Sequence, residues 1–283
     1  TDKFAVYYKE HGAATFPGNA LESSAVTVND DGSCSFTVSH QGDEGKKYDY
    51  YYLMQYNSYC KLNSQKTAAC TRLNCVQYPS ATSYDPLYDI VAGAPSLDVD
   101  ATQTAMVSSY KRLTTPFKLE LSGLDEVLAG EKVNQVTVLF SASATNMSDC
   151  LVGLPYLNLE DGSISSISSQ TAGNGITADY VSGLSHNGSL DCWFMVNPVT
   201  LPACDLTVTV LGDTKALSRT GTVGDALQFL PNKVNRIGFN ISGEGFTSEQ
   251  CVTASLINQV PSVSSKGKML GWTFANPPIR TEA

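Results

Sequence analysis

The stretch YDYYYLMQY, residues 48–56, is the most strand-prone part of the sequence. Aromatic side chains pack well on a pleated surface and are therefore enriched in β-strands. Because successive side chains of a strand point to opposite faces, Tyr51 and Leu53 are expected on one face. The other face then carries Tyr48, Tyr50, Tyr52, Met54 and Tyr56. Large apolar side chains on both faces predict a strand that is covered on both sides, as in a β-sandwich.

Outward from this stretch, short segments of alternating polarity recur, each bounded by Gly, Pro, Asn, Asp or Ser. They predict strands over residues 3–8, 25–28, 35–38, 117–121, 133–141, 156–159, 192–199, 206–211, 226–230 and 234–241. The turn Asn29-Asp30-Asp31-Gly32 predicts a hairpin between the second and third of these. A helical pattern is confined to Ser122–Ala129, before Gly130. Many short strands without interleaved helices indicate an all-β protein made of antiparallel sandwiches.

The composition excludes several classes of protein. Only 16% of the 283 residues are charged, and 27 acidic residues against 18 basic ones give a net charge of −9. Nucleic-acid binding needs clustered Lys and Arg, so no nucleic-acid partner is expected. No apolar run approaches the roughly 20 residues of a membrane helix. The chain has no initiating Met and no signal-peptide pattern, which predicts a mature product or a trimmed form.

The length allows two domains that each bury a core. Pro95 precedes a stretch with few strand signals, SLDVDATQTAMVSS, and the strand pattern resumes after Pro116. We therefore place a boundary between Ala94 and Ser109, which gives one β-sandwich over residues 1–108 and a second over residues 109–283. The pattern is less regular beyond about residue 242, where we expect a C-terminal extension.

Common catalytic and nucleotide-binding motifs are absent from the sequence. The run 183–188, GLSHNG, approaches a nucleophile elbow but lacks the second glycine at the required position, so a turn is expected there. Asp89, Asp98 and Asp100 are carboxylates of the kind that glycosidases use, but nothing in the sequence brings two of them together. The Asp30-Asp31-Gly32 sequence lacks the alternating acids of a calcium loop. We expect no catalytic, cofactor-binding or metal-binding residues, and a secreted hydrolase with dispersed acids is kept as a third alternative.

The eight cysteines form no CxxC pair, and the three histidines are far apart, which argues against a zinc site. Two interpretations stay open. The cysteines are buried thiols that act as small hydrophobic side chains, or they form one or two disulfides in an exported protein. The loop from Cys60 to Cys75 is where such a bond is expected.

Six tyrosines fall within residues 48–59. One interpretation is a sandwich strand whose phenol groups reach solvent or a neighbouring loop. The functional alternative is an aromatic platform for a sugar or a protein partner. Under that alternative, Tyr51, Tyr59 and Trp272 are the candidate contacts.

Several segments, in their order along the chain, follow the pattern of one known family. They are Asp2–Tyr7, Tyr48–Tyr56, Tyr84–Ala92, Thr115–Leu121 with Lys132–Phe140, Trp193–Leu201 with Leu206–Leu211, and Leu230–Phe239. This order resembles the fimbrillin-like proteins of Bacteroidales, the FimA/Mfa-type subunits of type V pili and their relatives, and covers about residues 2–240. Two features depart from the family: Lys118 or Leu119 stands where a His usually follows the Pro-Phe pair, and the last 40 residues exceed a simple pilin ending.

The resemblance implies two tandem transthyretin-like β-sandwich domains of Greek-key topology in an exported cell-surface protein. It implies a non-enzymatic structural or adhesive subunit of a fimbria, or an accessory component at its tip or anchor, with no cofactor and with a lipid on the precursor as the link to the outer membrane. The implied partners are other pilin subunits, which add an extended strand to a groove, and a host glycan or protein receptor. The alternative is a glycan-binding outer-membrane surface lipoprotein in which Tyr51, Tyr59 or Trp272 stack on sugar rings.

Overall fold

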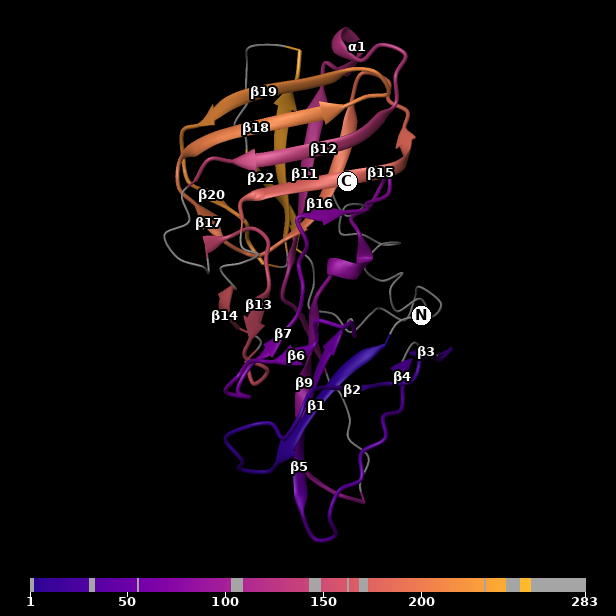
Figure 1. Cartoon of the computed structure of the whole chain (residues 1–283), viewed down its shortest axis with the longest axis vertical. Helices are drawn as coiled ribbons and strands as arrows, with labels where there is room; N and C mark the ends of the chain where they lie inside the picture. The colour runs from indigo at the N-terminus through magenta and orange to yellow at the C-terminus, as the bar shows by residue number, and fades with distance from the viewer. Residues whose placement is uncertain are drawn as a thin grey trace.

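The computed structural model describes residues 3–30, 34–54, 56–102, 109–142, 149–161, 163–167, 173–231, 233–242 and 250–255. Over these residues the chain is built almost entirely of β-strands, with a four-residue helix, α1 (Leu124–Val127), and a 3₁₀ turn, η1 (Pro86–Tyr88). No helix in this part of the chain is long and apolar enough to cross a membrane. The molecule is elongated, with the N-terminal strands at one end and the C-terminal sheets at the other (Figure 1). The all-β prediction is confirmed.

A five-stranded sheet forms the N-terminal end of the molecule, in the order β10-β9-β5-β1-β2, with all neighbours antiparallel. Its strands are β1 (Phe4–Glu10), β2 (Leu21–Glu22), β5 (Lys47–Met54), β9 (Val91–Asp100) and β10 (Tyr110–Arg112). The pairing of β1 with β5 runs in unbroken register over all of β1. The predicted alternation along β5 is confirmed, because Tyr51 and Leu53 lie in one core cluster and Tyr52 and Met54 lie in another.

Two stacked sheets form the C-terminal end. The first has the order β16-β11-β21-β22, with β11 (Thr115–Ser122), β16 (Leu190–Val196), β21 (Lys233–Asn240) and β22 (Gln250–Ser255). The second has the order β19-β18-β12-β15-β8, with β8 (Val76–Gln77), β12 (Val133–Phe140), β15 (Gly175–Leu184), β18 (Cys204–Leu211) and β19 (Ala216–Val223). The strands of one sheet cross those of the other (Figure 1), and side chains from both fill one core.

Most strand pairs are antiparallel, as predicted, but two are parallel. These are β11 with β21, and β15 with β8. Each parallel pair joins strands that are far apart in the sequence. Local hairpin patterns predict only antiparallel neighbours, so they do not predict these pairs.

Short segments are exchanged between the two ends of the molecule. A four-stranded sheet, β14-β13-β7-β6, combines β6 (Lys61–Leu62) and β7 (Ala69–Cys70) with β13 (Pro155–Leu157) and β14 (Ile164–Ile167). In the opposite direction, β8 joins the edge of β15, and Leu73, Tyr84 and Tyr88 enter the C-terminal core. The predicted boundary at residues 108–109 stays a prediction, and segments from both sides of it share these sheets.

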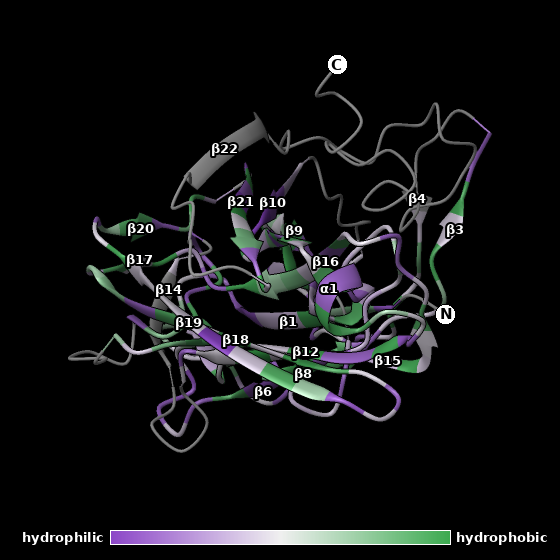
Figure 2. Cartoon of the chain, turned by 90° about the horizontal axis from the view of Figure 1, so that it is seen from above, coloured by the Kyte–Doolittle hydropathy of each residue, from purple (hydrophilic) through white to green (hydrophobic). Residues whose placement is uncertain are grey.

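Two small hairpins complete the described strands. β3 (Thr27–Val28) pairs with β4 (Cys34–Ser35), which confirms the hairpin predicted around Asn29 in a shorter form. β17 (Thr200–Leu201) pairs with β20 (Leu227–Gln228). Hydrophilic and hydrophobic residues alternate along β18 (Figure 2), whereas residues 192–196 of β16 form a continuous, buried apolar run.

The stretch after Pro95 differs from the prediction. Residues up to Asp100 continue β9 instead of forming a strand-poor connection. Pro95 is accommodated because the register between β9 and β5 is interrupted at this point, between the pairs Tyr50↔Ser96 and Tyr52↔Gly93. A bulge tolerates a residue that lacks an N–H group. The strands β15 and β19 were not predicted either, since their sequences are rich in Gly, Ser and Thr.

Candidate functional site

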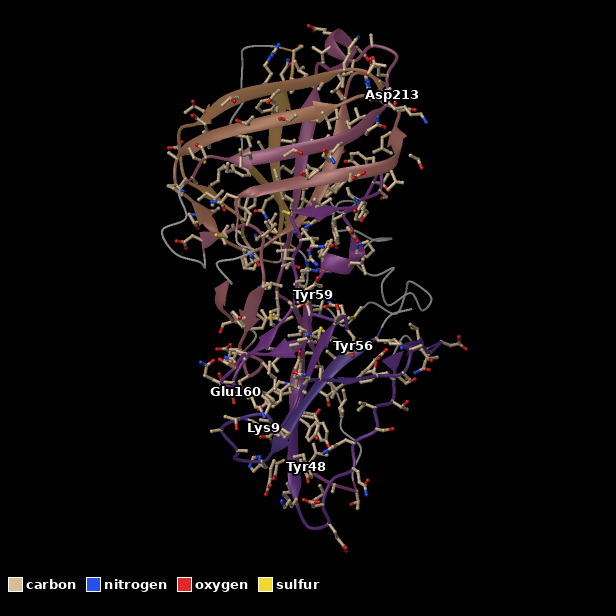
Figure 3. The ribbon with its side chains drawn as sticks, in the orientation of Figure 1. Lys9, Tyr48, Tyr56, Tyr59, Glu160 and Asp213 are labelled. Atoms are coloured by element: carbon tan, nitrogen blue, oxygen red, sulfur yellow. The ribbon has the colours of Figure 1, made fainter. Side chains whose placement is uncertain are left out.

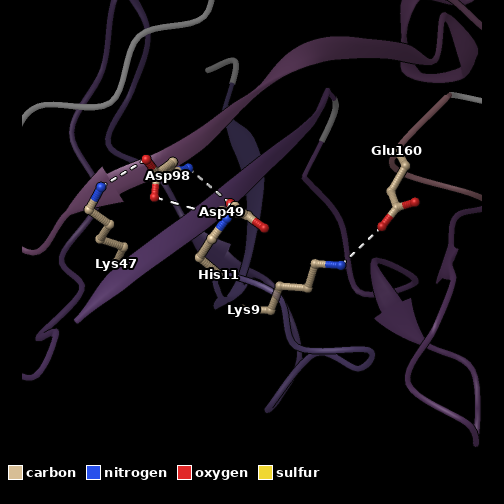
Figure 4. A network of polar contacts seen from close by, with 6 residues as sticks. All are labelled: Lys9, His11, Lys47, Asp49, Asp98 and Glu160. Carbon is tan, nitrogen blue, oxygen red and sulfur yellow. Dashed lines mark hydrogen bonds and ion pairs between the residues drawn. The ribbon is translucent and has the colours of Figure 1, made fainter.

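Tyr51 lies inside the N-terminal core. Its side chain is 2% exposed, and its ring meets that of Phe16 edge-on with the centroids 5.3 Å apart. The Lys9 ammonium lies 5.6 Å from the Tyr51 ring centroid and forms an ion pair with Glu160 at 3.0 Å (Figure 4). Burial raises the pKa of the Tyr51 hydroxyl. In this fold the ring has no open face on which a sugar could stack.

The opposite face of β5 and β1 is covered by residues 35–42, which we call the strap. Exposed and half-buried residues alternate along the strap with a period of two, as in a strand. Phe36 stacks on Phe4 with the ring centroids 4.6 Å apart and meets Tyr52 edge-on at 6.1 Å. The backbone of the strap bonds to Ser24, whose N–H donates to the carbonyl of Thr37 at 2.7 Å. Side-chain packing therefore holds the strap on the sheet.

His40 anchors the far end of the strap among three tyrosines. Its ring centroid lies 3.8 Å from that of Tyr8, 4.7 Å from that of Tyr48 and 5.6 Å from that of Tyr50. The His40 Nδ1 is 2.8 Å from the Tyr50 hydroxyl. Burial lowers the pKa of His40. The tyrosine-rich face predicted from the sequence is therefore occupied by another part of the same chain.

Tyr59 lies at the surface near the middle of the long axis (Figure 3). Its side chain is 39% exposed, and the Arg72 guanidinium carbon lies 4.6 Å from its ring centroid. Asn74 and Tyr78 follow Arg72 along the chain. The Tyr78 side chain is 53% exposed. The Asn74 Nδ2 donates to the Tyr88 hydroxyl at 2.5 Å. Exposed aromatic rings beside planar polar side chains have the chemistry that binds sugar rings. We call Tyr59 and Arg72 the waist cluster, after the position of Tyr59 near the middle of the long axis.

The remaining candidate contact, Trp272, lies outside the described residues. Ligand binding by Tyr51, Tyr59 or Trp272 stays a prediction, although the fold separates the buried ring of Tyr51 from the exposed ring of Tyr59. The sequence did not reveal this difference, because both tyrosines belong to the same aromatic run.

Gln77 joins the two sheets of the C-terminal sandwich, and no motif in the sequence indicated it. Its fully buried side-chain amide accepts from the Met195 N–H at 2.8 Å and donates to the Met195 carbonyl at 2.7 Å. The Gln77 amide thus makes the two hydrogen bonds with the backbone of Met195 that a neighbouring strand would make at this edge of β16. One residue earlier, β8 pairs with β15, and the Thr177 N–H donates to the Cys75 carbonyl at 2.7 Å.

A buried ion pair fixes the passage between the two ends. Arg112 on β10 contacts Asp89 through two nitrogens, with Nε 2.5 Å from Oδ1 and Nη2 3.0 Å from Oδ2. Both side chains are nearly inaccessible, and the buried Tyr84 also hydrogen-bonds to Asp89. Charge-assisted bidentate pairs of this type fix both partners in orientation as well as in distance.

A polar network ties β1 to β5 and β9 at the N-terminal end (Figure 4). His11 Nδ1 lies 2.8 Å from Asp49 Oδ1, which also accepts from the Asp98 N–H at 3.0 Å, and Lys47 pairs with Asp98 at 2.8 Å. The hydrogen bond to Asp49 raises the pKa of His11. Among the described residues, no group of three or more His, Cys, Asp or Glu side chains is placed to hold a metal ion.

The six cysteines with described side chains carry thiols: Cys60, Cys70, Cys75, Cys150, Cys192 and Cys204. The disulfide expected within the Cys60–Cys75 loop is therefore not present in this structure. Burial raises the pKa of Cys70 to about 11 and that of Cys192 to about 12, so both stay protonated at neutral pH. Protonated thiols are poor nucleophiles.

Two strands offer backbone edges of very different length. On the side away from β5, β2 covers β1 only at Ala5 and Val6, so the part of β1 from Tyr7 to Glu10 has no paired strand there within the described ranges. At the C-terminal end, β19 pairs with β18 over all eight residues, and its outer side carries no strand among those described. Such edges present N–H and C=O groups to any extended chain.

Two solved structures match the chain over nearly its whole length, and both are described as a putative cell adhesion protein. The one from Bacteroides uniformis has a TM-score of 0.52 at 14% identity and covers 90% of this chain and 91% of its own. The chain has the fold of these proteins. The second, from Bacteroides ovatus, has a TM-score of 0.50 at 10% identity and covers 88% of this chain and 85% of its own.

The resemblance to Bacteroidales surface proteins is confirmed at the level of the fold, and at these identities the likeness concerns the fold alone. No protein-family model matches the chain, and no curated protein sequence matches it. Transthyretin-like, Greek-key topology within the β-sandwiches stays a prediction.

Proposed function

We propose that this protein is an adhesive cell-surface protein that acts without catalysis, either as a structural subunit of a fimbria or as an accessory component at its tip or anchor. Its fold is shared with proteins described as cell adhesion proteins. The low content of charged residues and the net charge of −9 suit a surface that contacts other proteins or glycans rather than nucleic acid. In this proposal residues 1–108 and 109–283 form the two domains, and a lipid on the precursor anchors the protein to the outer membrane.

The observation that carries the proposal is the uncovered edge of β1. In the antiparallel ladder the backbone groups of alternate residues point to the same side. The Phe4 carbonyl accepts from the Ser23 N–H at 3.0 Å on the side of β2, so the backbone groups of Tyr8 and the N–H of Glu10 also point to that side. The Glu10 carbonyl already accepts from the Ala13 N–H at 2.9 Å. An extended segment of a neighbouring subunit can pair there, with backbone hydrogen bonds giving affinity and alternating side chains giving register.

Assembly of the full chain tests this proposal. At high protein concentration we expect filaments or ladders of oligomers that resist detergent, seen by electron microscopy and by gel electrophoresis of unboiled samples. Tyr8→Pro removes one N–H from the uncovered edge and should reduce assembly strongly, whereas Tyr8→Val keeps that N–H and should assemble.

A second measurement protects the test against misfolding of the proline variant. In hydrogen exchange, the amides of Tyr8 and Glu10 should exchange quickly in the monomer and slowly in the assembled wild-type protein. Assembly with no added protection at these two amides would contradict strand addition at β1.

The waist cluster favours glycan binding as a second candidate function. Tyr59 exposes its ring beside Arg72, and Tyr78 is a second exposed aromatic residue in the following segment of the chain. On a glycan array, Tyr59→Ala should abolish binding while Tyr59→Phe, which keeps the ring, should preserve it. Trp272→Ala tests the remaining predicted contact, and a wild-type protein that binds no glycan would remove this candidate.

A further inference from the structure

The longest backbone edge among the described strands belongs to β19. At the hairpin that precedes it, the Gly212 N–H donates to the Lys215 carbonyl at 2.7 Å. Because bonding alternates along an antiparallel pair, Leu217 and the following odd-numbered residues bond to β18. The backbone groups of Ser218, Thr220 and Thr222 therefore point away from the sheet. Their register with β18 is continuous and free of bulges.

The two faces of β19 differ in chemistry. On the outer face, hydroxyl groups form pairs across the strands, with Thr220 Oγ1 2.8 Å from Thr207 Oγ1 and Ser218 Oγ 2.9 Å from Thr209 Oγ1. On the inner face, the register places Leu217, Arg219, Gly221 and Val223 opposite the inward-facing residues of β18. Val223 is buried in the C-terminal core, and Leu217 packs against it from the edge.

We propose that β19 pairs antiparallel with β19 of a second copy of this chain, around a two-fold axis that passes through Thr220. In this register the only charged residue of the strand, Arg219, faces Gly221 of the second copy, which has no side chain to obstruct it. Leu217 faces Val223 of the second copy, so the apolar inner face continues across the axis. The outer face brings the two Thr220 hydroxyls together.

The neighbouring registers are less favourable. Moving the axis to Arg219 places the two guanidinium groups directly opposite one another, where like charges repel. A shift by one residue of a single strand would point the outer hydroxyls of one copy toward the core side of the other. The axis at Thr220 pairs residues 217–223, seven of the eight residues of the strand.

In the monomer, the Arg219 side chain occupies one hydrogen-bonding group of the outer edge of β19. Its Nη1 donates to the Ser218 carbonyl at 3.2 Å, one of the groups that point away from the sheet. In the dimer, the N–H of Thr222 of the second copy takes over this carbonyl. The resulting sheet would run without interruption through both copies, and the interface is separate from β1, on which the proposed strand addition depends.

The oligomeric state of the full chain tests the inference. Sedimentation over a concentration series should show a monomer–dimer equilibrium. Thr220→Pro removes an N–H on each side of the axis without touching the backbone bonds to β18, and two lost hydrogen bonds should weaken the dimer by about 30-fold. Thr220→Val keeps the N–H and should dimerise like the wild type. Gly221→Lys places a second positive charge opposite Arg219 and should also prevent dimerisation.

A cross-linking experiment tests the register itself and does not depend on the proline variant. In a Cys75→Ser background, Thr220→Cys places two thiols at the axis, and a short bismaleimide should join them. Ala216→Cys serves as the control, since in this register its two thiols lie about 26 Å apart, eight residues at about 3.3 Å each.

A monomer at all concentrations would overturn the inference, as would a dimer that Thr220→Pro leaves intact or cross-linking that is stronger at residue 216 than at residue 220. Because Tyr8→Pro acts on β1 and Thr220→Pro on β19, loss of filaments and loss of the dimer are distinguishable outcomes.

Discussion

The two ends of the molecule bury their apolar side chains in different ways. The C-terminal end has two complete sheets whose central strands contribute fully buried aliphatic side chains, such as Val136 on β12 and Val208 on β18. The N-terminal end has one large sheet, covered by the strap on one face and by a small sheet with strands of two to four residues on the other. The comparison teaches that the C-terminal end contains most of its own core, whereas the N-terminal end depends on segments that reach it from elsewhere in the chain.

Loss of the buried ion pair between the two ends should cause the largest decrease in stability. Arg112→Ala leaves the Asp89 carboxylate buried without its charge partner, which should lower the free energy of unfolding by about 3–5 kcal/mol. Urea denaturation measures the change. Lys46→Ala is the matched control, because it removes a cation whose ion pairs are exposed and should change stability little. Equal effects of the two substitutions would contradict the role given to the buried pair.

Gln77 tests whether the C-terminal sandwich needs the segment that it receives. Gln77→Ala leaves the N–H and C=O of Met195 without partners, and the free energy of unfolding should fall by about 3 kcal/mol. Gln77→Glu should also destabilise, since a carboxylate accepts from the N–H but cannot donate to the carbonyl. Gln135→Ala, on the outer side of β12, is the control in the same sandwich. A Gln77→Ala protein as stable as the control would show that the edge of β16 does not need this amide.

The two histidines of the N-terminal end should respond to pH in opposite ways. Burial lowers the pKa of His40, so the stability from its neutral form is complete above about pH 6.5 and falls as the pH drops below that value. The hydrogen bond to Asp49 raises the pKa of His11, so its contribution is complete below about pH 6.5 and is lost as the pH rises through the raised pKa. NMR titration of both imidazoles checks the order of the two pKa values.

A substitution at His40 isolates the contribution of the strap to the pH dependence of stability. His40→Phe keeps an aromatic ring among the tyrosines and removes the titrating group. Its stability should therefore decline less than that of the wild type when the pH falls below about 6.5. A wild-type His40 that titrates above His11 would contradict the packing described for the strap.

The smallest expected effect lies at the contact between β1 and the segment after β13. Glu160→Gln removes the ion pair with Lys9, but the Glu160 side chain is 63% exposed, so the loss should stay below about 1 kcal/mol. Thermal unfolding measures it. A loss well above about 1 kcal/mol would contradict the weak contribution expected of a solvent-exposed ion pair.

The sequence predicted strands that alternate clearly and missed those that do not. β5 and β18 were expected because large apolar residues recur at every second position, and the structure places each of them between two neighbouring strands of its sheet. β19 was missed because its inner face carries Arg219 and Gly221, which a strand at the edge of a sheet tolerates. The alternation along residues 48–54 predicted which side chains share a face. It was wrong for Tyr56, which lies beyond the end of β5 and packs with Tyr51 and Leu53 rather than with Tyr52 and Met54. Nothing local predicted that the strap would cover one of the two faces.

The candidate contacts were harder to predict than the strands. Tyr51 and Tyr59 have the same side chain and lie eight positions apart, yet one is buried and the other exposed. The difference depends on Lys9 and Phe16, which approach Tyr51 from another part of the chain. Gln77 has no distinguishing neighbours in the sequence, and its role depends on Met195, which is more than a hundred residues away.

The exchange of short segments between the two ends has a mechanical consequence. The backbone passes the middle of the molecule repeatedly, since β8 and the residues around Tyr84 belong with the C-terminal core while β13 and β14 belong with the N-terminal strands. A load applied along the long axis is therefore divided among several covalent connections. The two ends cannot swing about a single linker, and the protein should transmit tension as one stiff rod.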